Sequence, residues 1–289
     1  MKSPRLIRVF ALASLFAGGF SSLHAARQDG LVVYMNFDEE QKRDEDENSG
    51  PLRNLAEKSD VIAKKIGEGL EATLVPGRFG KAAEFKNGGN TGKRIDDWAI
   101  NLGKLDEVYS GNFTVACWVK YSGLHKGVVI GNKPASSELA PGWAFLTQNG
   151  RNFHTAAVGE TTLNFAAANK PQDGAWHHWA MVVNRDLGSL AFYFDGALVK
   201  EQKLAKTNST FGDNRDTTVG ASPDEKDGAS KVAVDDLGIW SRALSKDEVK
   251  ALGFGTGKKI PETSSYAWAG AAAVVGGLAW VRRRRRAKA

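Results

Sequence analysis

Apolar and polar side chains alternate with a period of two along several stretches of this chain. The clearest stretch reads FTVACWVKY over residues 113–121. Alternation of this kind is typical of a half-buried β-strand, because successive side chains point to opposite faces of a sheet. Many such runs separated by turn residues predict an all-β fold of antiparallel strands, a sandwich or a barrel. The other predicted strands cover residues 31–37, 127–131, 143–147, 153–157, 162–167, 177–183, 190–194, 197–203, 217–220 and 231–240.

Local motifs add a hairpin, a helix and a loop to this prediction. Asp195-Gly196 separates two apolar runs and favours a type I′ hairpin turn, because both central residues of that turn need positive φ. Ser245-Lys246-Asp247-Glu248 is a capping-box pattern, which predicts one short helix that stops at Gly253. Residues 39–70 begin with a dense run of charged side chains, and we expect them to form an exposed loop.

The positive charge of the chain belongs to its two ends. Residues 1–26 carry three net positive charges and residues 261–289 carry five, so the body between them keeps −2 of the total of +6. No cationic surplus remains there to neutralise phosphates, which excludes a nucleic-acid-binding body. The single cysteine of the chain excludes an internal disulfide and a Cys-type zinc site.

The first 26 residues have the three parts of a secretory signal peptide. Lys2, Arg5 and Arg8 form the positive start, residues 9–20 are apolar and uncharged, and small residues follow up to Ala26. The alternative is a membrane anchor, but the apolar run is short for a transmembrane span.

The C-terminal end predicts a transmembrane helix. Residues 266–281 are uncharged and would form about 24 Å of helix, which flanking arginines extend by snorkelling. Positive charge stays on the cytoplasmic side, so the body would lie outside. The residues just before and after this helix are Pro261, Glu262, Arg282, Arg283 and Arg284.

This order of a Pro-Glu pair, an apolar helix and an arginine cluster resembles the PEP-CTERM sorting tail of Gram-negative bacteria. The resemblance covers about thirty residues and implies recognition by an exosortase-type membrane protease. Thr263 stands where that family usually has a second proline. A plain single-span anchor is the alternative. The chain thus divides into a signal peptide (1–26), a β-sandwich domain (27–252), a linker (253–265) and a transmembrane helix with its tail (266–289).

Six segments of the body occur in an order that resembles the LamG-like jelly roll of the concanavalin A-like lectin/glucanase superfamily. The resemblance covers residues 31–252 and implies two curved antiparallel sheets packed face to face, with one short helix near the C-terminal side. It implies little about function, because the fold hosts lectins, adhesion modules and hydrolases. The segments are NFDEE (36–40), GRFGKAAEF (77–85), FTVACWVK (113–120), WHHWAMV (176–182), AFYFDG (191–196) and VDDLGIWSRALSKDEVKAL (234–252).

The sequence offers few candidates for catalysis. A glycoside hydrolase needs two carboxylates that flank one bond, and no predicted strand carries alternating acids. Glu45 and Glu47 have the spacing but lie in the charged run. Cys117 shares the apolar face of its strand, which favours a buried thiol over a reactive one. His177 and His178 are neighbours on a strand and point to opposite faces, which favours packing over metal binding.

Calcium and a sugar ligand remain as binding hypotheses. Some members of the superfamily hold a structural calcium with an acid after the first strand and another near the last, and the resemblance implies Asp38 with Asp236 or Asp235 here. Asp235 and Asp236 should point to opposite faces, so we expect only one to serve. The alternative is that these acids cap turns. Trp118 and Trp143 are the best candidates for an exposed aromatic platform on which a sugar stacks, although core packing is the alternative for both.

The sequence therefore predicts an exported protein of the Gram-negative cell envelope, anchored in the inner membrane or released at the surface. The leading hypothesis is non-catalytic recognition or adhesion, with extracellular polysaccharide or a surface glycan as partner. A structural matrix component without a specific ligand is the first alternative. A glycoside hydrolase is the second.

Overall fold

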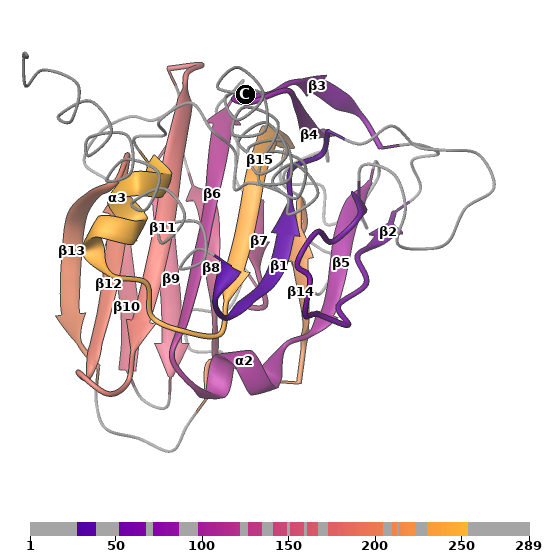
Figure 1. Cartoon of the computed structure of the whole chain (residues 1–289). Coiled ribbons are helices and arrows are strands. Elements are labelled where there is room, and N and C mark those ends of the chain that lie inside the picture. Colours follow the sequence, from indigo (N-terminus) through magenta and orange to yellow (C-terminus); the bar gives the residue numbers. More distant parts are fainter. Residues whose placement is uncertain are drawn as a thin grey trace, which may run out of the picture.

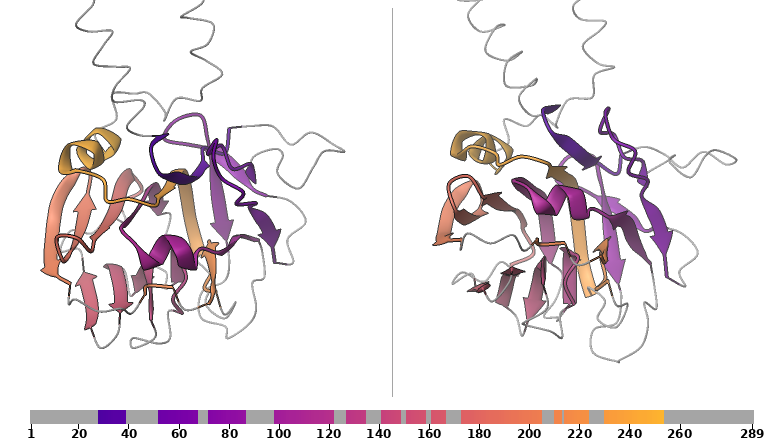
Figure 2. Two further views of the ribbon diagram at one scale, coloured as in Figure 1. Left: turned by 60° about the horizontal axis from the view of Figure 1, so that its bottom comes forward. Right: turned by 90° about the horizontal axis from the view of Figure 1, so that it is seen from below.

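The computed structural model is a sandwich of two antiparallel sheets packed face to face (Figures 1 and 2). It describes residues 28–38, 52–67, 72–86, 98–121, 127–134, 141–148, 151–158, 161–166, 173–204, 210–212, 214–223 and 230–253. The all-β double-layered fold is thus confirmed. The predicted signal peptide, charged run and transmembrane tail lie outside these residues. No helix in the part of the chain that the structure describes has the length and hydropathy of a membrane span.

The first sheet, called sheet A, has eight strands. Their order is β13-β12-β11-β6-β15-β4-β3, and β1 pairs with β15 beside this path. The strands are β1 (Leu31–Met35), β3 (Leu74–Pro76), β4 (Lys81–Lys86), β6 (Phe113–Tyr121), β11 (Trp176–Asn184), β12 (Ser189–Phe194), β13 (Ala197–Lys203) and β15 (Ser230–Trp240).

The second sheet, called sheet B, has seven strands in the order β10-β9-β8-β7-β14-β5-β2. A short helix, α2 (Asp106–Ser110), links β5 of this sheet to β6 of sheet A. The strands are β2 (Lys64–Ile66), β5 (Ala99–Lys104), β7 (Gly127–Gly131), β8 (Gly142–Gln148), β9 (Arg151–Val158), β10 (Thr161–Ala166) and β14 (Asp216–Val219).

The main hydrophobic core fills the space between the sheets. The alternating face of β6 supplies Phe113, Val115, Cys117 and Val119 to this core, as its sequence pattern predicts. Cys117 is completely buried, and burial raises the pKa of its thiol far above the ordinary value, which disfavours the reactive thiolate. The prediction of a core cysteine is confirmed.

The outer face of sheet A is also covered, over part of its area, by a second apolar cluster. Figure 1 shows helix α3 (Lys246–Gly253) lying across β11, β12 and β13. Its Val249 is buried, and so is Leu244 just before it. The residues of sheet A beneath this layer are Leu31, Tyr34, Ala116, Ala180, Val182, Ala191, Tyr193 and Trp240.

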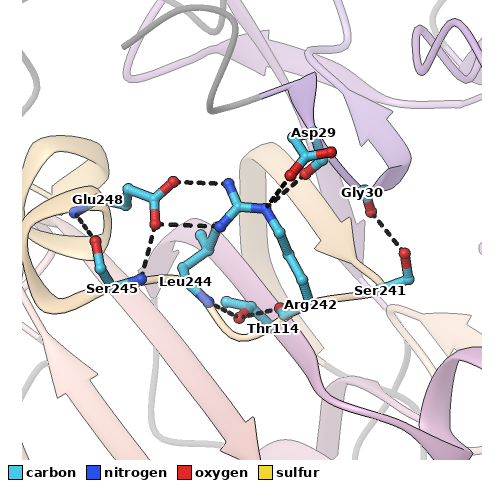
Figure 3. A network of polar contacts seen from close by, with 8 residues as sticks. All are labelled: Asp29, Gly30, Thr114, Ser241, Arg242, Leu244, Ser245 and Glu248. Carbon is cyan, nitrogen blue, oxygen red and sulfur yellow. Dashed lines mark hydrogen bonds and ion pairs between the residues drawn. The ribbon is translucent and has the colours of Figure 1, made fainter. Parts of the chain in front are cut away.

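A polar network holds α3 against the sheet (Figure 3). The Arg242 guanidinium donates to both carboxylate oxygens of Glu248, at 2.6 and 3.1 Å. Thr114 of β6 donates to the Arg242 carbonyl and accepts from the Leu244 N–H, each at 2.9 Å. Ser245 and Glu248 satisfy each other's backbone N–H groups, which confirms the capping box. Burial opposes ionisation of Glu248, but the hydrogen bonds from Arg242 and Ser245 outweigh it and lower the pKa of this carboxyl.

Removing the cap should weaken this helix measurably. We expect Ser245→Ala to lower the free energy of unfolding by about 1 kcal/mol, because the Glu248 N–H loses its acceptor at the helix start. Urea denaturation followed by circular dichroism measures the change. Lys246→Ala, at an exposed position one residue later, is the control and should stay within about 0.5 kcal/mol of the parent. Equal effects of the two substitutions would contradict the capping role.

The predicted exposed loop over residues 39–70 is wrong in its second half. Residues 52–67 pack against the sandwich: Asn54, Ala56 and Ala63 are buried, and Lys64–Ile66 is the edge strand β2. The Asn54 side chain accepts from the Tyr34 N–H at 2.9 Å and donates to the Val32 carbonyl at 3.0 Å, so it extends the edge of β1. The loop prediction rested on the dense charge at the start of the segment, and it was extended to residues 52–67, which carry buried side chains.

Candidate functional site

An open pocket of about 460 Å³ lies at one end of sheet A, beside the end of α3. Its size falls in the range of small-molecule sites. Five separate segments build it: the β3–β4 turn, β6, β11, the β12–β13 turn and the last residue of α3. The lining residues are Arg78, Trp118, Trp176, His177, Asp195 and Gly253.

Arg78 and Trp118 form one wall of the pocket. The Arg78 guanidinium carbon lies 4.9 Å from the centre of the Trp118 ring and 5.1 Å from that of Phe79. Phe79 in turn meets Trp118 edge to face, with ring centroids 6.0 Å apart. These contacts hold an exposed cation in a fixed place above an aromatic surface.

Two carboxylates hold the turn that carries Arg78. Asp38, just after β1, accepts from the Lys81 N–H at 2.7 Å, and Asp235 of β15 accepts from the Phe79 N–H at 3.0 Å. Gly80 has a φ of +73°, and a Cβ there would collide with the Asp38 carboxylate. Gly80, the second glycine of GRFG, is therefore required for this clamp.

Asp235 is an unusual group because it is completely buried. Burial and the neighbouring carboxylate of Asp236 raise its pKa to about 8, against the hydrogen bonds that it accepts from backbone N–H groups. A bulge in β15 places Asp235 opposite Trp118 but Gly238 opposite Ala116, one residue more than regular pairing allows.

This bulge corrects the expectation that Asp235 and Asp236 point to opposite faces. Asp236 has a φ of +45° and accepts a hydrogen bond from the Tyr34 hydroxyl at 2.8 Å. Tyr34 belongs to the cluster outside sheet A, so both carboxylates lie on the outer side. Alternation holds only where a strand is regular.

The acids proposed for calcium thus face hydrogen-bond donors in this structure. Asp38 and Asp235 accept from the β3–β4 turn, and Asp236 accepts from Tyr34. Across the described ranges, no three Asp, Glu, His or Cys side chains come together as a metal site. These contacts suit turn clamps better than calcium ligands, and the calcium site stays a prediction.

His177 and Asp195 form the opposite wall of the pocket. Asp195 and Gly196 have φ values of +47° and +72°, which confirms the type I′ turn. The Asp195 carboxylate lies 2.8 Å from Nδ1 of His177 and accepts from the His178 N–H at 2.9 Å. The His177 ring stacks on Phe194, with centroids 4.8 Å apart.

His178 points to the outer face and packs against Trp118, with ring centroids 5.3 Å apart. Burial lowers the pKa of His178 to about 3, so its ring is neutral at physiological pH. The predicted packing is confirmed for both rings and the predicted hydrogen bonding for His177, whereas Nδ1 of the buried His178 ring has no hydrogen-bond partner among the described residues.

The two tryptophans proposed as platforms have different environments. Trp143 is completely buried in the core, where it packs against Tyr109, Phe113 and Phe145, so it offers no exposed surface and that prediction is corrected. Trp118 is 6% exposed but lines the pocket, beneath Arg78. The sorting residues Pro261, Glu262 and Arg282–Arg284 lie outside the described residues.

A family model described as the concanavalin A-like lectin/glucanases superfamily matches residues 93–250, more than half of the chain. The chain belongs to this superfamily. The match runs from the residues just before β5 to Lys250 in the middle of α3, so it includes Trp118, Trp176, His177 and Asp195 of the pocket. No curated protein has significant sequence similarity to the chain.

Several solved structures share the lectin/glucanase-type fold of this chain. The binding domain of Paraclostridial Mosquitocidal Protein 1 superposes with a TM-score of 0.56 at 14% identity, covering 78% of this chain and 52% of that one. The binding domain of botulinum neurotoxin serotype D gives 0.55 at 14% identity, with 81% and 52% covered. The chain therefore spans about half the length of these structures. At such low identity the likeness concerns the fold alone.

Proposed function

We propose that this chain is an exported, non-catalytic recognition protein that binds a saccharide in the pocket between Arg78 and Asp195. Extracellular polysaccharide or a surface glycan is the partner. The signal-peptide and sorting-tail patterns of residues 1–26 and 261–289 support export, recognition by an exosortase-type protease, and a place in the cell envelope or at its surface.

The convergence of aromatic rings and polar groups in one depression carries this proposal. Trp176 and Trp118 supply apolar ring surface, while Arg78 supplies hydrogen-bond donors at its rim. Sugars use both, because their C–H faces lie on aromatic rings and their hydroxyls need polar partners. Among proteins of similar fold, one botulinum neurotoxin binding domain is known in complex with SialylT, and cell entry of botulinum neurotoxin type C depends on two ganglioside molecules.

The chemistry of the pocket favours binding over hydrolysis. Of the described residues that line it, Asp195 alone carries a carboxylate, and both of its oxygens contact His177 or the His178 N–H. Glycoside hydrolysis requires two carboxylates about 5–9 Å apart on either side of the scissile bond. Glu84, the isolated acid of β4, pairs with Lys86 at 2.9 Å.

A glycan array probed with the purified full-length protein tests this function. We expect hits that Trp176→Ala weakens about tenfold, since about 60 Å² of lost ring contact at ~25 cal/mol/Å² is about 1.5 kcal/mol. Leu187→Ala is the matched control, because Leu187 is 79% exposed in the β11–β12 turn and does not line the pocket. An array without hits for the folded protein, or hits that Trp176→Ala leaves unchanged, would refute the proposal.

A further inference from the structure

The Arg78 guanidinium has no acidic partner among the residues that the structure describes. Its contacts are with the rings of Trp118 and Phe79, and no carboxylate among the described residues forms an ion pair with it. Asp235 is buried and accepts a hydrogen bond from the Phe79 N–H of the same turn. The guanidinium thus keeps its planar set of donors for a ligand.

A second cation, Lys120, lies beside the pocket on the same face of sheet A. It is two residues from Trp118 on β6, so both side chains point outward, and it stands directly opposite Trp176 on β11. Lys120 is half-buried, and within the described ranges it too forms no ion pair with an acid. On β4, two strands away, Glu84 is already paired with Lys86.

The carboxylates at and beside the pocket, by contrast, already have hydrogen-bond partners. Both oxygens of Asp195 contact the two histidines of β11, as described above. His177 also approaches Asp173 through Nε2, at 3.3 Å from each carboxylate oxygen. The acids on this side therefore face His177, whereas on the other side Arg78 lies over aromatic rings and Lys120 forms no ion pair with a described acid.

We propose that the pocket selects anionic saccharides: a carboxylate or sulfate on the sugar pairs with Arg78 and Lys120 while the ring lies against Trp176. This inference rests on the proposed saccharide binding and names its ligand class. Arginine suits the role, because its planar fork donates two parallel hydrogen bonds to such an oxyanion. The aromatic rings cover one side of the guanidinium and keep water from that side, which strengthens the attraction relative to a fully solvated pair.

Binding of four soluble probes to the full-length protein tests this inference. The probes are polygalacturonate, its neutral methyl ester, dextran sulfate and neutral dextran. We expect the charged member of a pair to bind at least tenfold more tightly than its neutral partner, and raised salt to reduce this difference. A preference confined to polygalacturonate identifies a carboxylate ligand, and one confined to dextran sulfate identifies a sulfate; either supports the inference.

Two charge-removing variants locate the effect. Arg78→Met and Lys120→Met keep an apolar stem and should each weaken the charged probes by fivefold or more, without changing the neutral ones. Lys104→Met is the matched control, because it removes one exposed charge from sheet B and should change nothing. Circular dichroism of each variant checks that the fold is kept.

The possible failures are distinguishable. If neutral and charged probes bind equally and both variants match Lys104→Met, saccharide binding stands and the selection of anions is overturned. If no saccharide of either kind binds the folded protein, the proposed function itself fails.

Discussion

Replacing Trp143 by alanine should lower the free energy of unfolding by about 3–5 kcal/mol. The ring lies in the centre of the core, with ring centroids 5.5 Å from Tyr109 and 5.8 Å from Phe145, and its loss leaves a cavity that close-packed neighbours cannot fill. Urea denaturation followed by circular dichroism measures the loss.

Trp176→Ala is the matched control for this experiment. Trp176 is half-buried at the pocket, so the same change should cost about 1 kcal/mol or less in stability while it weakens saccharide binding. The two substitutions therefore distinguish a tryptophan that stabilises the core from one that contacts a ligand. Similar losses of stability in both variants would contradict the difference in burial on which this expectation depends.

The second large effect concerns pH and Asp235. Its pKa is about 8 in the folded protein and about 3.9 in an unfolded chain. Between these values the folded state holds a proton that the unfolded state has released, so stability falls as pH rises from about 4 to 8. One group of this kind contributes a slope of at most about 1.4 kcal/mol per pH unit.

Asp235→Asn should remove this contribution, because the amide does not ionise. His178 acts in the opposite sense: its pKa is about 3 when folded, against about 6.5 unfolded, so its contribution is lost as pH falls. The stability of the parent minus that of the variant, measured by urea denaturation at each pH from 4 to 8, therefore isolates Asp235. Leu187→Ala, which removes no ionisable group from an exposed turn, is the control and should give a flat difference. A flat difference for Asp235→Asn as well would refute the raised pKa.

The sequence predicted the regular strands well, because alternation is a local property of extended backbone. Residues 113–121 form β6 with the expected core face, and Asp195-Gly196 and Ser245–Glu248 form the expected turn and cap. The elements β2, β3, β4, β5 and α2 were not predicted. β2, β3 and α2 span three to five residues each, too few for a period to emerge, and α2 begins without a side-chain cap. β4 and β5 have six residues each, but both bury two neighbouring residues and so depart from simple alternation.

The pocket was harder to predict than the strands. The sequence indicates Trp118 as a candidate binding residue, His177 as a strand residue and Asp195 as a turn residue. Arg78 belongs to the GRFG segment, but nothing in that segment shows that its turn folds over Trp118. These residues are separated by up to about 120 positions in the chain, and only the pairing of β4, β15, β6 and β11 brings them together.

The sequence by itself determined the double-layered sheet, its family resemblance, the hairpin turn and the capped helix, because each follows from neighbouring residues and the backbone geometry they favour. The tertiary structure alone decided which tryptophan is core and which lines the pocket. Both faces of β6 are apolar enough to be buried, and whether a face meets solvent depends on what packs over it. Here α3 and the β3–β4 turn cover the outer face and leave a gap at Trp118, whereas Trp143 of sheet B points into the core and is covered by sheet A.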